Sequence, residues 1–217
     1  MLTRVAERVK AAREQLCRLD AACGDGDHGE SLARGFEEVE KRIAGCENHL
    51  PGPLLTIAGR ALIAGCGGAT GPIMGTFFTE AGRAAGQAPE VDLPELARMF
   101  RAGYEGVRRR GGAEPGQKTV LDALLPATAA LETAVEEKAC LAEALRRAAE
   151  AAEQGARQTA GMIARQGKAR YLGERSLGHP DAGASSMALI IRTISETLEQ
   201  QPFAGAGGSR GNEEVPQ

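Results

Sequence analysis

Apolar residues recur three or four positions apart along almost the whole chain. Leu32, Phe36, Val39 and Ile43 are one such series, and this spacing places them on one face of a helix. No segment shows the strict alternation of apolar and polar residues that a half-buried strand needs. The pattern therefore predicts an all-α protein. Eight amphipathic helices are expected, near residues 2–20, 32–43, 54–63, 72–86, 96–107, 119–135, 141–165 and 187–198.

Four connections between these helices are unusually rich in glycine and hydrogen-bonding groups. They are CGDGDHGES (23–31), GCGGATGP (65–72), RGGAEPGQKT (110–119) and GKARYLGERSLGHPDAG (167–183). A helical bundle needs only short connections. If the helices alternate in direction, the loops after the first, third, fifth and seventh helices meet at one end. We therefore expect a binding site there, built from loops on a rigid scaffold.

Composition narrows the class of protein. The chain has 217 residues, of which 42% are hydrophobic and only 3% aromatic, with a net charge of −3. This composition favours one globular unit and gives no indication of nucleic-acid binding. The five scattered cysteines form no C-x-x-C pair, and we find no signal peptide or membrane-spanning run. We expect a cytoplasmic protein with a helical domain at 1–203 and a polar, disordered tail at 204–217.

The stretch Gly24-Asp25-Gly26-Asp27-His28-Gly29 matches the G-x-G-x-x-G fingerprint of dinucleotide-binding folds letter for letter. That fingerprint is meaningful only between a strand and a helix. Here a predicted helix precedes it, and its aspartates would repel a pyrophosphate. The dinucleotide-binding interpretation therefore fails on context.

Acidic residues give this stretch another meaning. Asp25 and Asp27 are two positions apart, and Asp20 at the end of the first helix can fold back towards them. Crowded hard oxygen ligands favour Mg²⁺, which completes its shell with water and substrate phosphates. The aspartates would then hold the cations that contact phosphate. The alternative is that Asp25 or Asp27 only caps the helix opened by His28; one aspartate would suffice for that.

All four loops resemble one known family. LDAACGDGDHGESLARGF (19–36), GGATGPIMGTFF (67–78), AEPGQKTVLDALLPA (113–127) and ARYLGERSLGHPDAGASS (169–186) are similar, in order, to the L subunit of dihydroxyacetone kinases. The same module forms the C-terminal domain of single-chain members. The resemblance covers about residues 1–200. It implies a barrel of eight antiparallel helices with the nucleotide site at one end.

The resemblance also implies particular site residues. Two Mg²⁺ ions would be held by Asp20, Asp25 and Asp27. ADP or ATP would be contacted by His28, Gly29, Glu30, Ser31, Ala69, Thr70, Gly111, Val120, Lys168, Asp181, Ala182 and Gly183. Ser31, Thr70, Val120, Lys168 and Ala182 depart from the commonest residues of the family, but every metal ligand is present.

The implied function is that of a kinase subunit that needs partner chains for turnover. Bound ADP would accept a phosphoryl group from a phosphocarrier subunit of a phosphotransferase system and pass it to dihydroxyacetone on a separate substrate-binding subunit. One alternative is an ATP-dependent kinase subunit for dihydroxyacetone or another small ketose. Another is a nucleotide-sensing regulatory partner. A phosphohistidine relay through His28 is a further, less favoured, alternative, and a homodimer is left open.

Overall fold

The computed structural model describes residues 1–200, and every regular element in that range is helical. The elements are α1 (Leu2–Ala11), α2 (Arg13–Ala21), α3 (His28–Ala44), α4 (Pro51–Gly65), α5 (Thr70–Ala85), α6 (Leu93–Gly111), α7 (Leu121–Glu136), α8 (Leu141–Gln158), the 3₁₀ turns η1 (Thr159–Gly161) and η2 (Lys168–Ser176), and α9 (Ala182–Glu199). The predicted all-α class is confirmed. The predicted tail at 204–217 and the domain boundary at 203 lie outside the described residues. Within residues 1–200, no helix is both long and apolar enough to cross a membrane.

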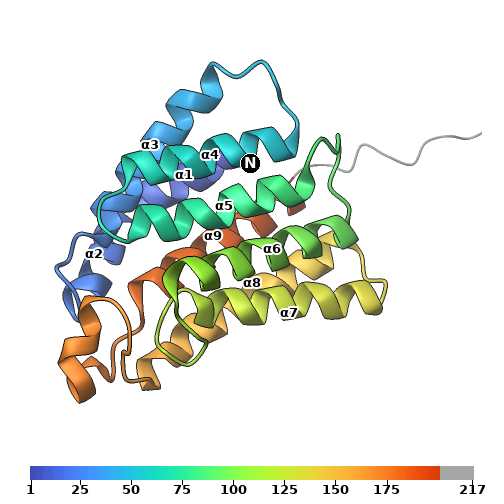
Figure 1. The fold of residues 1–217 in the computed structure, drawn as a ribbon. Coiled ribbons are helices and arrows are strands. Elements are labelled where there is room, and N and C mark those ends of the chain that lie inside the picture. The colour runs from blue at the N-terminus through green and yellow to red at the C-terminus, as the bar shows by residue number, and fades with distance from the viewer. Residues whose placement is uncertain (201–217) are drawn as a thin grey trace, which may run out of the picture.

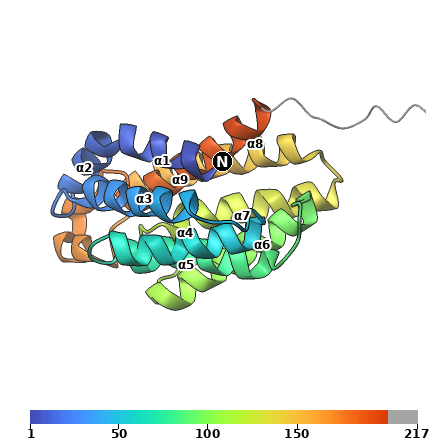
Figure 2. The same cartoon turned by 90° about the horizontal axis from the view of Figure 1, so that it is seen from above.

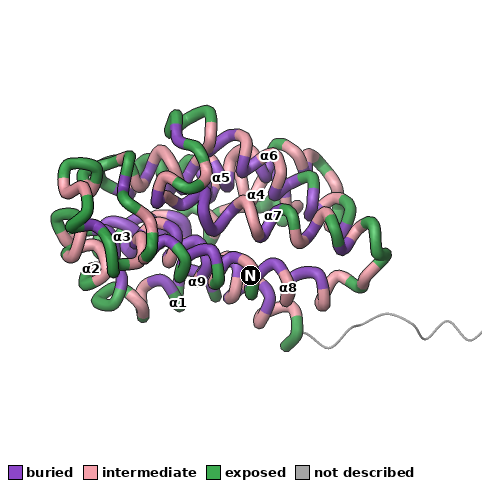
Figure 3. The backbone as a smooth tube through the Cα atoms, turned by 90° about the horizontal axis from the view of Figure 1, so that it is seen from below, coloured by how far each residue is buried: buried purple, intermediate pink, exposed green. Residues whose placement is uncertain are grey.

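The helices pack in chain order. From α3 to α9 each helix contacts the next, and α9 contacts α1 and α2, which pack on α3, so that the contacts close into a ring. Figures 1 and 2 show the long helices side by side, with the segment between α8 and α9 beside α2 at one end. Buried stretches alternate with exposed ones along each helix (Figure 3), as amphipathic helices around one core require.

The predicted first helix is two helices, which corrects the expected count. The chain bends at Ala12, whose ψ is 1°. The bend lets α2 lie against the start of α3, where a Cβ on Gly29 would meet the Arg13 carbonyl oxygen at 2.0 Å. The helical spacing of apolar residues continues across Ala12, because α1 and α2 bury their apolar residues in the same core.

The alanine-rich helix is shorter than predicted. It ends at Gln158, not near Arg165, and the 3₁₀ turn η1 follows. Thr159 explains the ending, since its hydroxyl donates to the Ala156 carbonyl and accepts from the backbone N–H of Asp181. These bonds use tertiary partners that helical periodicity cannot reveal.

Two kinds of packing fill the interior. Phe36, Phe77, Phe78 and Phe100 form edge-to-face contacts with ring centroids 5.5–6.1 Å apart. Elsewhere glycine lets backbones touch. On α4, a Cβ on Gly59 would lie 2.2 Å from Thr79 Oγ1 and 2.6 Å from the Gly75 carbonyl oxygen of α5. A core with few aromatic residues is thus filled by bringing helices together.

We expect Gly59→Ala to lower the free energy of unfolding by about 1–3 kcal/mol, because the added methyl must push α4 away from α5. Gly45→Ala is the matched control, since no atom lies within 4 Å of a Cβ there. Urea unfolding of both variants makes the comparison. Equal stability of the two variants would contradict this account of the α4–α5 contact.

Candidate functional site

A cavity of about 560 Å³ opens at one end of the helical ring, a volume that suits a small-molecule ligand. Its lining includes residues from all four glycine-rich loops. The predicted convergence of these loops is therefore confirmed. The first residues of α3, α5, α7 and α9 also line the cavity. Each of these helices directs the positive end of its dipole there, which favours anions.

Three carboxylates meet at the mouth of this cavity. Oxygens of Asp20, Asp25 and Asp27 all lie within 4.8 Å of one another. Glycine makes this possible: a Cβ on Gly24 would lie 2.4 Å from Asp20 Oδ1, and Gly26 has a φ of +77°. The donor set consists of hard oxygens, partly or fully exposed, so the residues fit a site for Mg²⁺.

The capping alternative can be examined at the start of α3. The Asp27 side chain makes no capping hydrogen bond. Instead Asp20 Oδ2 accepts from the backbone N–H of Asp27 at 3.1 Å and of His28 at 3.4 Å. Asp20 therefore performs the capping from the preceding helix. The carboxylates of Asp25 and Asp27 are not needed for it, which favours their role as cation ligands.

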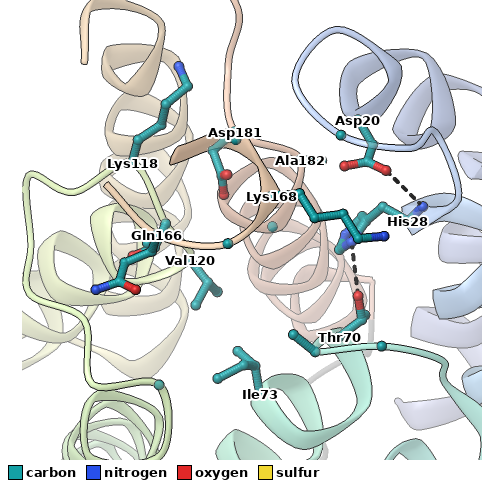
Figure 4. A pocket seen from close by; sticks show the side chains of 18 of the residues that line it. Asp20, His28, Thr70, Ile73, Lys118, Val120, Gln166, Lys168, Asp181 and Ala182 are labelled. Carbon is teal, nitrogen blue, oxygen red and sulfur yellow. Dashed lines mark hydrogen bonds between the residues drawn. The ribbon is translucent and has the colours of Figure 1, made fainter. Parts of the chain in front are cut away.

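Lys168 compensates part of the negative charge. Its ammonium pairs with Asp25 Oδ2, and the hydrogen bond from Lys168 is the main cause that lowers the pKa of the Asp25 carboxyl. Both side chains are about half exposed or more. Exposed pairs of this kind contribute little stability and are easily exchanged. Figure 4 shows Lys168 reaching across the cavity towards Asp20 and His28.

His28 is buried between three helices. Its Nε2 lies 2.9 Å from Ser186 Oγ of α9, and its Nδ1 lies 3.3 Å from Thr70 Oγ1 of α5. Burial lowers the pKa of His28, so the ring is neutral near pH 7. With both ring nitrogens hydrogen-bonded to neighbouring helices, the geometry disfavours the phosphohistidine alternative.

The opposite wall of the cavity is apolar. Ile73, Val107 and Val120 line it together with Ala182. In Figure 4, Ile73 and Val120 lie apart from Asp20 and His28 across the cavity. The site thus joins an apolar surface to a cation-binding surface. This combination suits a ligand with a flat apolar part and a phosphate chain.

Most of the residues predicted from the sequence come together here. Those lining the cavity are Asp20, Asp25, Asp27, His28, Ala69, Thr70, Gly111, Val120, Lys168, Asp181, Ala182 and Gly183.

Gly29, Glu30 and Ser31 do not line the cavity. Gly29 packs on α2 as described, and Glu30 pairs with Arg13 at 3.5 Å. Ser31 Oγ accepts from the Gly67 backbone N–H at 2.7 Å and so ties α3 to the loop after α4. The close backbone contact of Gly29 and the side chains of Glu30 and Ser31 therefore support the site from behind.

Lys118 lines the cavity and was missed as a candidate. Its side chain is buried, with 3% of the residue exposed, and its backbone φ is +60°. Burial lowers the pKa of its ammonium, and the nearby carboxylates of Asp181 and Asp122 partly offset this shift. The only sequence signal was its place in a glycine-rich loop, which does not distinguish it from its neighbours.

Asp181 stands at the start of α9. Its carboxylate accepts from the backbone N–H of Ala184 at 2.7 Å and caps the helix. Burial raises the pKa of Asp181 to about 6, although Lys118 acts in the opposite direction.

Comparison with known proteins gives the same family throughout. The model of the DAK2 domain matches residues 22–196. The PEP-dependent dihydroxyacetone kinase, ADP-binding subunit DhaL, of Escherichia coli is 39% identical over 194 residues, which cover 89% of this chain and 92% of that subunit. The D-erythrulose kinase of Mycolicibacterium smegmatis is 40% identical; the match covers 89% of this chain but only 34% of that enzyme.

Solved structures agree. The dihydroxyacetone kinase of C. freundii in complex with AMP-PNP and Mg²⁺ superimposes with a TM-score of 0.69 at 27% identity. The match covers 90% of this chain and 33% of that one.

The raised pKa of Asp181 predicts a pH-dependent stability. In the folded protein the protonated form is favoured, so the stability this group contributes is full below pH 4 and is lost as the pH rises through about 6. Asp181→Asn keeps the cap without the charge. We expect the variant to gain about 1–3 kcal/mol relative to the wild type between pH 4 and 7. Chemical unfolding in EDTA without nucleotide measures the difference; a difference independent of pH would contradict the assignment.

Proposed function

Because this chain belongs to the DAK2 domain family, we propose that it is the nucleotide- and magnesium-binding subunit of a dihydroxyacetone kinase. The observation that carries the proposal is the cavity itself, in which three clustered carboxylates face an apolar wall. The ADP-binding subunit of Escherichia coli, similar over most of its length, supports it. So does the C. freundii kinase with AMP-PNP and Mg²⁺.

Asp20, Asp25 and Asp27 would hold two Mg²⁺ ions. When bound, Mg²⁺ neutralises phosphate charge and aligns the transferring phosphoryl group. The apolar wall with Val120 would take the base. Thr70, Gly111, Lys168 and the start of α9 would surround the phosphates and ribose, and the first backbone amides of α3, from residues 28–31, would face the phosphates.

The chain's own residues act by position and charge. Lys168, released from Asp25, can turn its ammonium towards phosphate oxygens, and the helix N-termini add fixed positive dipole ends. No side chain of this chain needs to act as a nucleophile. The transferred group would pass to a substrate hydroxyl held elsewhere.

We propose that residues 1–203 form the nucleotide-binding unit and that it works in the cytoplasm with a separate substrate-binding subunit. Some relatives are named PEP-dependent and one, from Lactococcus lactis, PTS-dependent; these names favour a phosphocarrier subunit of the phosphotransferase system as the phosphoryl donor. Bound ADP would then act as a coenzyme instead of exchanging with ATP.

A second candidate is an ATP-dependent kinase acting on another small ketose. The similarity to a D-erythrulose kinase at 40% identity favours it. Identifying the nucleotide that the purified protein releases on denaturation distinguishes these two candidate functions. Stoichiometric ADP indicates the coenzyme role, and a site that exchanges ATP freely indicates the second candidate.

We expect Asp25→Asn and Asp27→Asn each to weaken Mg²⁺-dependent ADP binding by at least about tenfold while the helical fold is kept. Each change removes one negative ligand from a cation site without changing its size. A tenfold loss corresponds to about 1.4 kcal/mol of binding free energy. Calorimetric titration with ADP and Mg²⁺ measures it.

Asp92→Asn is the matched control for these variants. Asp92 caps the N-terminus of α6, whereas the C-terminus of this helix lines the cavity. The Asp92 carboxylate accepts from the Glu95 backbone N–H at 2.8 Å. Asparagine caps about as well as aspartate, so this variant should bind like the wild type. If Asp25→Asn and Asp27→Asn bind ADP and Mg²⁺ with wild-type affinity, the assignment of these residues as metal ligands is wrong.

The need for a partner gives another prediction. The chain alone should leave dihydroxyacetone unphosphorylated, because the described cavity is accounted for by nucleotide and metal. Adding a substrate-binding subunit together with a phosphoryl donor, either the phosphorylated phosphocarrier or ATP, should give turnover. A coupled assay of the phosphorylated product measures it. Full turnover by the isolated chain would show that the substrate site has been misplaced.

A further inference from the structure

Lys118 occupies a backbone conformation that its side chain disfavours. Its φ of +60° lies in the left-handed region, which glycine adopts far more readily. Among the described non-glycine residues only Lys138, in the exposed turn between α7 and α8, shares this feature. The buried side chain of Lys118 must therefore make contacts that offset the conformational cost.

Those contacts join two distant points of the chain. The ammonium of Lys118 donates to the Thr159 carbonyl oxygen at 2.6 Å and also to the His179 carbonyl oxygen. Thr159 directly follows α8, and His179 lies just before α9. One side chain thus fixes both ends of the intervening segment, residues 160–178, to the loop before α7.

The segment 160–178 carries part of the cavity wall. Gln166, Gly167, Lys168 and Ala169 all line the cavity from it. Further bonds close its base, since the Gly178 N–H donates to the Ala160 carbonyl at 2.8 Å. One backbone bond, from the Arg165 N–H to the Gln117 carbonyl, also reaches the loop of Lys118.

The charge of Lys118 strengthens its two bonds. Within the described residues no carboxylate lies within 4.0 Å of its ammonium. The two carbonyl oxygens therefore replace the water that the buried ammonium has lost, and hydrogen bonds to a charged donor are stronger than neutral ones.

We propose that Lys118 is a positioning residue that holds the segment 160–178, and with it Lys168, in place over the nucleotide site. This rests on the proposed function for the identity of the ligand. The ammonium acts through the backbone carbonyls at the two ends of the segment and does not itself contact the nucleotide.

The test compares Lys118→Met, which removes the ammonium, with Lys118→Arg, which keeps a charged donor. Two measurements are made: hydrogen–deuterium exchange of peptides from 160–178, and calorimetric titration with ADP and Mg²⁺. In Lys118→Met we expect faster exchange confined to this segment and affinity weaker by at least about tenfold. Lys118→Arg should recover most of both.

Lys138→Met is the matched control, since it removes the same side chain from the same backbone conformation away from the cavity. It should match the wild type in both measurements. Unchanged exchange in Lys118→Met overturns the proposal, even if affinity falls, because a loss of affinity alone would mean direct ligand contact. Should Lys118→Met not fold, Lys118→Gln replaces it with the same two criteria. Failure of the wild type to bind ADP and Mg²⁺ would contradict the proposed function, while the exchange comparison would still decide the role of Lys118.

Discussion

The repulsion between three carboxylates is the constraint around which the loop end of this protein is organised. Asp20, Asp25 and Asp27 bring their oxygens within 4.8 Å of one another, an arrangement that opposes folding unless positive charge is nearby. The fold supplies it in several forms. Asp20 accepts two backbone N–H groups at the start of α3, and Lys168 pairs with Asp25. Helices α3, α5, α7 and α9 all begin at the cavity.

The interactions that stabilise the three carboxylates differ in how easily they can be broken. The bonds to Asp20 are part of the helix start and persist. The pair of Lys168 with Asp25 lies in solvent and can exchange for a cation. His28, by contrast, stays neutral and bonded to α5 and α9. The site therefore combines a fixed frame with one movable positive charge, and that charge lies on the segment whose ends Lys118 fixes.

The local chemistry and the grouping of the loops were predictable from the sequence, whereas the individual long-range contacts were not. The acidic cluster could be located because its members lie within eight positions of one another, and the loops could be grouped because alternating helices place every second connection at one end. The bend at Ala12 and the end of α8 depend on partners distant in sequence, Gly29 in one case and Asp181 in the other. Lys118 was missed for the same reason, since its contacts with Thr159 and His179 are 41 and 61 positions away.

The fortuitous match to a dinucleotide fingerprint shows why spacing needs context. In the dinucleotide-binding fold, the glycines provide a tight turn, close approach to pyrophosphate and helix–strand packing. Here Gly24 makes room for the Asp20 carboxylate, Gly26 adopts a positive φ, and Gly29 lets α3 touch the backbone of α2. The requirements are similar because both loops turn sharply into a helix start, yet the neighbours differ. In the dinucleotide-binding fold, the glycine loop and the start of the following helix bring backbone amides directly to the pyrophosphate. Here the end of the preceding helix and the loop add three carboxylates beside the helix start. These carboxylates make the surface suited to binding phosphate through a cation.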